Sequence, residues 1–134
     1  MKILLDTHIA LWAITDDERL SPKARKLLLD PQNRIYLSAV SVLEVNNKRK
    51  SKANNLAFTT AQFVEYCRIA GYIELPLLSE HLLNENSLRW KGPGEEHKDP
   101  YDRILLAQAK TEGLHLMTHD GKIRLFDESC VLPV

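Results

Sequence analysis

This 134-residue chain is organised around its first nine residues, Met1-Lys2-Ile3-Leu4-Leu5-Asp6-Thr7-His8-Ile9. Its short apolar run, from Ile3 to Leu5, is typical of a buried strand, and it ends abruptly in the carboxylate of Asp6. An ionisable group at the end of a buried strand costs free energy unless something compensates its charge. The sequence therefore predicts a partner for Asp6, and the residues below favour a divalent metal ion shared with three other acids.

Further short apolar runs alternate with longer amphipathic segments along the chain. We expect strands at residues 2–5, 34–37, 72–75, 114–117 and 130–132. We expect helices after Asp6, from Ser21-Pro22 to Leu29, after Ser38, after Thr59, at residues 79–87, and from Asp99-Pro100 to Gly113. Strands that alternate with helices and are apolar on both faces predict an α/β fold, with a central, mainly parallel five-stranded sheet between two layers of helices.

The length fits a single domain over residues 1–134. Eighteen acidic and eighteen basic residues give zero formal net charge, which argues against a protein that binds nucleic acid mainly through overall charge. Cys67 and Cys130 have no metal-ligand spacing and form no disulfide framework, so a reduced, cytoplasmic compartment is expected. Only three apolar residues follow Lys2, which predicts no secretory signal, and no run reaches the 18 apolar residues of a membrane helix.

Each of the acids has an ordinary explanation when it is taken alone. Asp6 is a possible cap for the helix that follows it. Ser41 and Glu44 have the spacing of a capping box. Asp99 is a good cap before proline, Asp102 then lies in a first turn where the helix dipole favours negative charge, and Asp120-Gly121 has the sequence of a turn.

Taken together, the acids point to a metal site. Asp6 and Asp120 follow the carboxyl ends of two predicted strands, and Glu44 lies about two turns into the helix after a third. Asp102 joins them if the loop at residues 90–98 returns the chain to the same edge of the sheet. Four converging carboxylates repel one another unless a cation is present, and hard oxygen ligands select Mg²⁺ or Mn²⁺. The histidines near these acids, His8, His97 and His119, lack the spacing of a helical zinc pair, so they are expected beside the ligands, at the substrate or at the surface.

At these residues the chain resembles the PIN domain nucleases, in particular the VapC-like toxins of bacterial type II toxin–antitoxin pairs. The matching segments, in family order, are Leu4-Leu5-Asp6-Thr7-His8 with Trp12, Ser38-Ala39-Val40-Ser41-Val42-Leu43-Glu44, His97-Lys98-Asp99-Pro100-Tyr101-Asp102-Arg103 and Met117-Thr118-His119-Asp120. Two departures are Leu43, where a tryptophan is common in this subgroup, and residues 46–55, which are richer in asparagine and charge than expected.

The resemblance implies a PIN-like α/β/α sandwich and an endoribonuclease that hydrolyses RNA with Mg²⁺ or Mn²⁺. It assigns metal binding and catalysis to Asp6, Glu44, Asp102 and Asp120. It gives supporting roles to Thr7, Ser38, Asp99, Arg103 and Thr118, with Arg103 either at a phosphate or balancing the acids. It also implies a cognate antitoxin protein and a homodimer.

The basic residues after Glu44, including Lys48 and Arg49, are open to two interpretations. They are either cations placed favourably at a helix C-terminus or a surface that binds the RNA backbone. Two other functions remain as alternatives to the nuclease. One is a receiver-like signalling domain, which would need an acidic phosphoacceptor at the end of a central strand, where this chain has Leu75-Pro76. The other is a non-catalytic module whose acidic crevice binds a basic partner. A haloacid-dehalogenase-like phosphatase would need an acid at His8.

Overall fold

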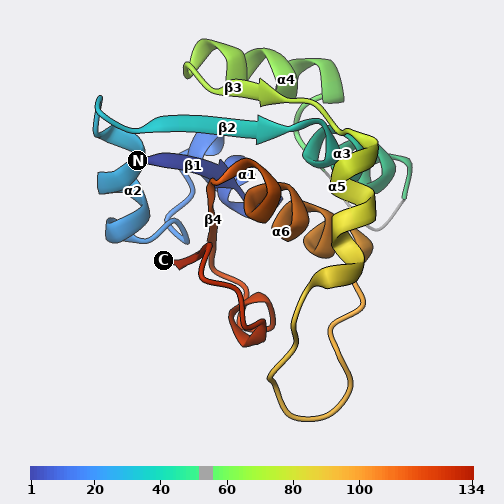
Figure 1. The fold of residues 1–134 in the computed structure, drawn as a ribbon. Coiled ribbons are helices and arrows are strands. Elements are labelled where there is room, and N and C mark those ends of the chain that lie inside the picture. Colours follow the sequence, from blue (N-terminus) through green and yellow to red (C-terminus); the bar gives the residue numbers. More distant parts are fainter. Residues whose placement is uncertain (52–55) are drawn as a thin grey trace.

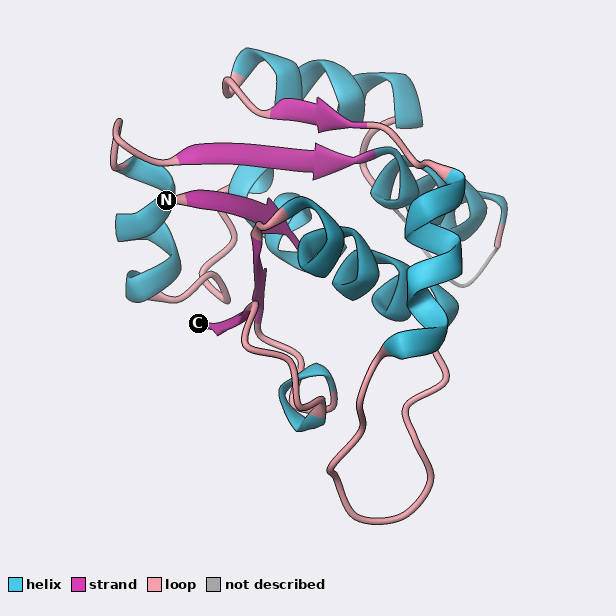
Figure 2. Cartoon of the chain, viewed as in Figure 1, coloured by secondary structure: helices cyan, strands magenta, loops and turns pink. Residues whose placement is uncertain are grey.

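The computed structural model describes residues 1–51 and 56–134. Residues 52–55, which end the segment 46–55 that is rich in asparagine and charge, lie outside the described part of the chain. Its elements alternate between strands and helices as the sequence predicts (Figures 1 and 2). In chain order they are β1 (Lys2–Leu5), α1 (Thr7–Thr15), α2 (Pro22–Leu29), β2 (Arg34–Ser38), α3 (Ala39–Lys50), α4 (Thr60–Ile69), β3 (Ile73–Leu75), α5 (Ser79–Asn84), the 3₁₀ helix η1 (Glu85–Ser87), α6 (Pro100–Glu112), β4 (His115–Thr118), the 3₁₀ helix η2 (Ile123–Leu125) and β5 (Val131–Pro133).

The described strands form one parallel sheet in the order β3-β2-β1-β4-β5. β1 lies at its centre, where Ile3 pairs with Ile35 of β2 on one side and with His115 of β4 on the other. The predicted α/β fold with a five-stranded parallel sheet is therefore confirmed. Receiver domains have the strand order 2-1-3-4-5, so this topology excludes the receiver-like alternative.

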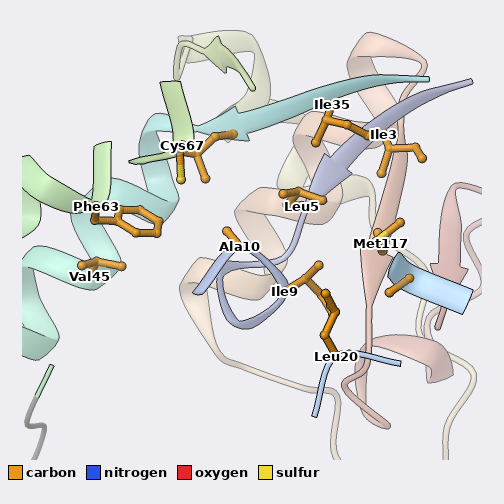
Figure 3. Packing of buried hydrophobic residues seen from close by; sticks show 12 residues of the cluster. Ile3, Leu5, Ile9, Ala10, Leu20, Ile35, Val45, Phe63, Cys67 and Met117 are labelled. Atoms are coloured by element: carbon orange, nitrogen blue, oxygen red, sulfur yellow. The ribbon is translucent and has the colours of Figure 1, made fainter. Parts of the chain in front are cut away.

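Successive side chains of the buried strands pack alternately into two separate hydrophobic cores, one on each face of the sheet. Ile3 and Leu5 point into a core with Ile9 of α1, Ala24 of α2 and Phe63 of α4 (Figure 3). Because successive side chains of a strand point to opposite faces, Leu4 and Leu116 enter the other core. There they pack with Leu105 and Leu106 of α6. Helices therefore cover both faces of the sheet.

Several helices begin at residues that the sequence identifies as caps. The Ser21 hydroxyl accepts a hydrogen bond from the backbone N–H of Ala24 (3.1 Å), and Thr59 forms a full capping box with Gln62. α6 ends at Gly113, which has the left-handed φ of 69° that a glycine adopts without strain.

The differences from the predicted elements are small. The predicted helix at residues 79–87 divides into α5 and the 3₁₀ helix η1, and strands β3, β4 and β5 each begin one residue later than expected. Within residues 1–51 and 56–134, no helix has both the length and the apolar character that a membrane crossing requires.

Candidate metal-dependent active site

The predicted acids meet at the edge of the sheet where β1, β2 and β4 end. Parallel strands bring their carboxyl ends to one edge, and the loop before α6 returns the chain to it (Figure 1). A cleft of about 430 Å³ opens there. Its walls carry the carboxylates of Glu44, Asp99, Asp102 and Asp120, together with Lys48, Lys122, His8, His97 and Gly121.

Asp6 does not line the cleft and is only 3% exposed, but its charge interacts with those of Glu44 and Asp102. Its side chain does not cap α1, so the ordinary explanation for this residue is wrong. Instead, Asp6 Oδ2 accepts a hydrogen bond from the Thr118 hydroxyl (2.7 Å), and the same hydroxyl accepts one from the backbone N–H of Asp120 (3.0 Å). Burial raises the pKa of Asp6, and the nearby Glu44 charge adds to the rise. The Thr118 hydroxyl therefore contacts two of the predicted ligand residues, the carboxylate of Asp6 and the backbone of Asp120.

Glu44 projects from α3 and is 4% exposed. It takes no part in a capping box, because the cap of α3 is Ser38, whose hydroxyl accepts a hydrogen bond from the backbone N–H of Val40. Glu44 Oε2 accepts a hydrogen bond from Lys48 Nζ at 2.6 Å. Glu44 Oε1 is buried without a hydrogen-bond partner among the described residues. A buried carboxylate oxygen without a partner is costly, so it marks a position where a cation would bind.

Asp102 lies in the first turn of α6, where the Asp99 side chain caps the helix by accepting from the Asp102 backbone N–H (3.0 Å). The Asp102 carboxylate is 2.8 Å from His97 Nε2. Burial raises the pKa of Asp102 to about 7, with further increases from the charges of Asp6, Asp99 and Asp120, although the His97 hydrogen bond opposes them. Three neighbouring carboxylates that raise one pKa place these acids in one electrostatic cluster.

Asp120 combines its two expected roles. Its Oδ1 accepts hydrogen bonds from the backbone N–H groups of Lys122 (2.7 Å) and Ile123 (3.2 Å), which is the turn role. At the same time the side chain faces the cleft with the other acids. The turn holds the carboxylate in place without burying it.

The remaining predicted residues divide into those beside the site and those outside it. The Thr7 hydroxyl donates to Ser41 (2.9 Å), and the Ser38 hydroxyl donates to Gln108 (2.6 Å), so both fix the helices behind the cleft. Arg103 and Arg49 do not line it.

Arg103 binds acids other than the four predicted ligands. Its guanidinium pairs with Glu85 and Glu96 and also donates to the backbone oxygen of His97. It therefore anchors the loop before α6. Arg49 donates to the backbone oxygens of Leu56 and Phe58, which ties the end of α3 to the chain that follows.

The side chains around the cleft suit a divalent cation by their chemistry. No three His, Cys, Asp or Glu side chains in the described part of the chain already stand together as a complete ligand set. The donors are nevertheless hard carboxylate oxygens, which Mg²⁺ and Mn²⁺ prefer. Glu44 Oε1 is buried without a hydrogen-bond partner among the described residues, although Lys48 binds the other oxygen of this carboxylate. Burial raises the pKa of Asp102, and the charges of Asp6, Asp99 and Asp120 add to the rise, so negative charge is concentrated here. The residues present thus fit such an ion.

Three contributions to the site are not predicted from the sequence. The His97–Asp102 pair has a weak signal, a histidine five residues before an acid. Lys122 follows Asp120-Gly121 closely enough to be found from the turn. Gln108 has no local signal, because its bond to Ser38 joins residues 70 positions apart.

Comparisons with known proteins agree with this fold. No curated protein matches the chain. A chain of the VapBC2 complex from Rickettsia felis, solved on a promoter DNA fragment, has a TM-score of 0.65 and 17% identity, covering 100% of this chain and 98% of that one. A chain of FitAB bound to the IR36 DNA fragment has a TM-score of 0.58 and 24% identity, covering 92% and 89%. A chain of VapBC-1 from nontypeable Haemophilus influenzae has a TM-score of 0.59 and 19% identity, covering 92% and 90%.

At these identities the structural matches establish a shared fold. The sequence itself provides the stronger comparison, because the family model described as "PIN domain" matches residues 3–129. The matched range contains every acid that lines the cleft, and also the buried Asp6. The chain belongs to the PIN domain family.

Proposed function

We propose that this protein is a metal-dependent endoribonuclease and the toxin of a toxin–antitoxin pair. The observation that carries the proposal is the gathering of Glu44, Asp102 and Asp120 at one cleft, with the charge of the buried Asp6 interacting with two of them. Membership of the PIN domain family supports nuclease activity. The VapBC and FitAB complexes among the structural matches support a toxin role.

In this proposal Asp6, Glu44, Asp102 and Asp120 hold Mg²⁺ or Mn²⁺. When bound, such an ion lowers the pKa of a water molecule and neutralises charge on phosphate oxygens. The protein's own groups keep the ligands in position: the Thr118 hydroxyl orients Asp6, and the His97 ring orients Asp102. Attack by water on an RNA phosphodiester leaves a 5′-phosphate and a 3′-hydroxyl.

Cleavage of RNA by purified protein tests this assignment directly. We expect activity with Mg²⁺ or Mn²⁺, and a loss of at least about a hundredfold in Asp6→Asn, because the buried side chain no longer carries a negative charge for the ion. Asp127→Asn is a matched control, since Asp127 is exposed and lies outside the cleft. Undiminished cleavage by folded Asp6→Asn protein would refute the assignment.

An antitoxin partner fits the charge of the cleft. Four carboxylates and two lysines line it, so a basic side chain of a partner protein, such as arginine, would compensate the excess of negative charge. The same binding is expected for the non-catalytic alternative, in which the protein only binds a basic segment of a partner and cleaves nothing. Purification with the genomic neighbour tests the partnership, and RNA cleavage by the free chain separates toxin from binding module.

A homodimer is also part of the proposal. Leu77, Leu78, Leu82 and Leu83 leave apolar side chains in solvent on and before α5, with Leu83 71% exposed. Exposed apolar groups concentrated in one segment favour association. Sedimentation should give a dimer for the wild type and a monomer for Leu83→Glu, whereas Leu29→Glu, at an isolated exposed leucine of α2, should remain dimeric.

A further inference from the structure

Lys48 makes the closest contact to the buried acid of α3. Its ammonium group lies 2.6 Å from Glu44 Oε2, four residues earlier on the same helix. The Glu44 side chain is 5% exposed, whereas that of Lys48 is 34% exposed. This pair therefore differs from a surface ion pair, because one partner is buried at the base of the cleft and the other reaches solvent.

The position of Lys48 gives its side chain two places to bind. Lys48 lines the acidic cleft, and it also lines a neighbouring groove of about 410 Å³ that contains Trp12 and Phe58. His8 is the other residue shared by both hollows. Lysine has a flexible four-carbon stem, and the Lys48 side chain borders both hollows, so its ammonium is not confined to Glu44 by the backbone.

A lysine ammonium and a divalent ion compete for the same carboxylate. Two cations a few ångströms apart repel each other, and Glu44 is one of the acids proposed to hold the ion. Glu44 Oε2 accepts a hydrogen bond from Lys48, whereas Glu44 Oε1 is buried without a hydrogen-bond partner among the described residues.

We propose that Lys48 is a built-in counter-ion of Glu44 that a metal ion displaces, and that the displaced ammonium then binds a phosphate of the RNA beside the cleft. This inference rests on the proposed function, and it adds an order of events and a substrate contact. Metal binding and RNA binding then strengthen each other. The metal ion displaces Lys48 from Glu44 toward the phosphate, and RNA that holds Lys48 at the phosphate leaves Glu44 free for the ion.

Calorimetry of Mn²⁺ binding to the RNA-free protein tests the first half. Removing the competing cation in Lys48→Met should tighten Mn²⁺ binding by about three- to tenfold. Lys50→Met is the matched control, since it removes an exposed charge from the same helix, and should change binding less than about twofold because salt screens distant charges. Lys48→Gln provides a second variant with a polar side chain, and thermal unfolding checks that each variant is folded.

Fluorescence anisotropy with a hydrolysis-resistant phosphorothioate RNA tests the second half. Mn²⁺ should strengthen RNA binding by the wild type, and Lys48→Met and Lys48→Gln should lose most of that gain. Weaker Mn²⁺ binding by both Lys48 variants would overturn the inference, because Lys48 would then be holding Glu44 in place for the ion. An unchanged gain in RNA affinity would overturn it as well.

These outcomes remain separate from a failure of the proposed function. If the wild type binds no Mn²⁺, or if Asp6→Asn binds it equally well, the metal site itself is wrong. If the wild type binds Mn²⁺ through Asp6 and the Lys48 variants behave like Lys50→Met, the counter-ion role alone is wrong.

Discussion

Replacing Asp102 by asparagine should stabilise the metal-free protein while destroying its response to metal. Asparagine keeps the shape of the side chain and an oxygen for the hydrogen bond with His97. It removes a carboxylate whose pKa is raised from 3.8 to about 7, chiefly by burial. Ionising Asp102 therefore costs the folded wild type free energy, and this cost is absent in the variant.

The size of the effect follows from the pKa. A rise from 3.8 to about 7 corresponds to about 4 kcal/mol between the two protonation states. The Asp102 side chain is 15% exposed, and we reduce the penalty to about 2 kcal/mol because nearby water and salt screen the charge. Loss of a negative charge from the first turn of α6 costs the variant about 0.3–1 kcal/mol. The net gain expected for Asp102→Asn is about 1–2 kcal/mol.

The stability gained by Asp102→Asn relative to the wild type should increase with pH. Because the folded pKa of Asp102 lies above the unfolded one, the folded state binds more protons between these two values, and wild-type stability falls as pH rises through that window. Asparagine has no such proton. The advantage of Asp102→Asn is therefore small near pH 4, grows up to pH 7 and is complete at pH 8.

Urea unfolding in a chelator at several pH values measures this difference. At pH 8 with Mn²⁺ at a hundred times its dissociation constant, the wild type should gain about 2.7 kcal/mol and the variant much less, which reverses their order. Asp127→Asn serves as the control for removing an exposed acid and should change stability by less than about 0.5 kcal/mol. A variant that is no more stable than wild type at pH 8 in chelator would refute the assignment of a buried, crowded carboxylate.

Three further substitutions test how the site is held. Thr118→Val removes the hydroxyl that binds Asp6 and should lower the free energy of unfolding by about 2 kcal/mol, measured with urea, because the lost hydrogen bond joins a buried charged group. Gly92→Ala would place a methyl group 2.6 Å from the ring of Trp90, which should cost about 1–3 kcal/mol and alter tryptophan fluorescence. Arg103→Met removes the ion pairs that anchor the loop before α6 and should increase amide hydrogen exchange at residues 94–98 without changing exchange in β1.

Each of these changes has a control at a comparable position. Thr15→Val removes an exposed hydroxyl whose hydrogen bond water can replace, so it should cost less than about 0.5 kcal/mol. Gly121→Ala adds a methyl group to open space and should leave stability nearly unchanged. Arg68→Met removes an exposed arginine paired with Glu65 and should leave loop exchange unaffected. Equal effects in a variant and its control would contradict the role given to that contact.

Much of the fold follows from the sequence because its signals are local. The apolar run before Asp6 predicts β1, and the serine before Pro22 predicts the start of α2, since each depends on neighbouring residues alone. The gathering of the acids also follows, because parallel strands share the edge at which they end. The division of residues 79–87 into two short helices has no comparable local signal.

The alternation of strands and helices, the parallel sheet and the acids at its edge follow from local sequence patterns. Three contacts do not: Asp6 binds Thr118 instead of capping a helix, Arg103 anchors a loop, and Lys48 binds one Glu44 oxygen while the other has no partner among the described residues. They differ from the patterns in the distance along the chain over which they act. Patterning and caps are set by residues within one turn or strand, whereas these partners and the burial around them depend on packing between elements that are far apart in the sequence.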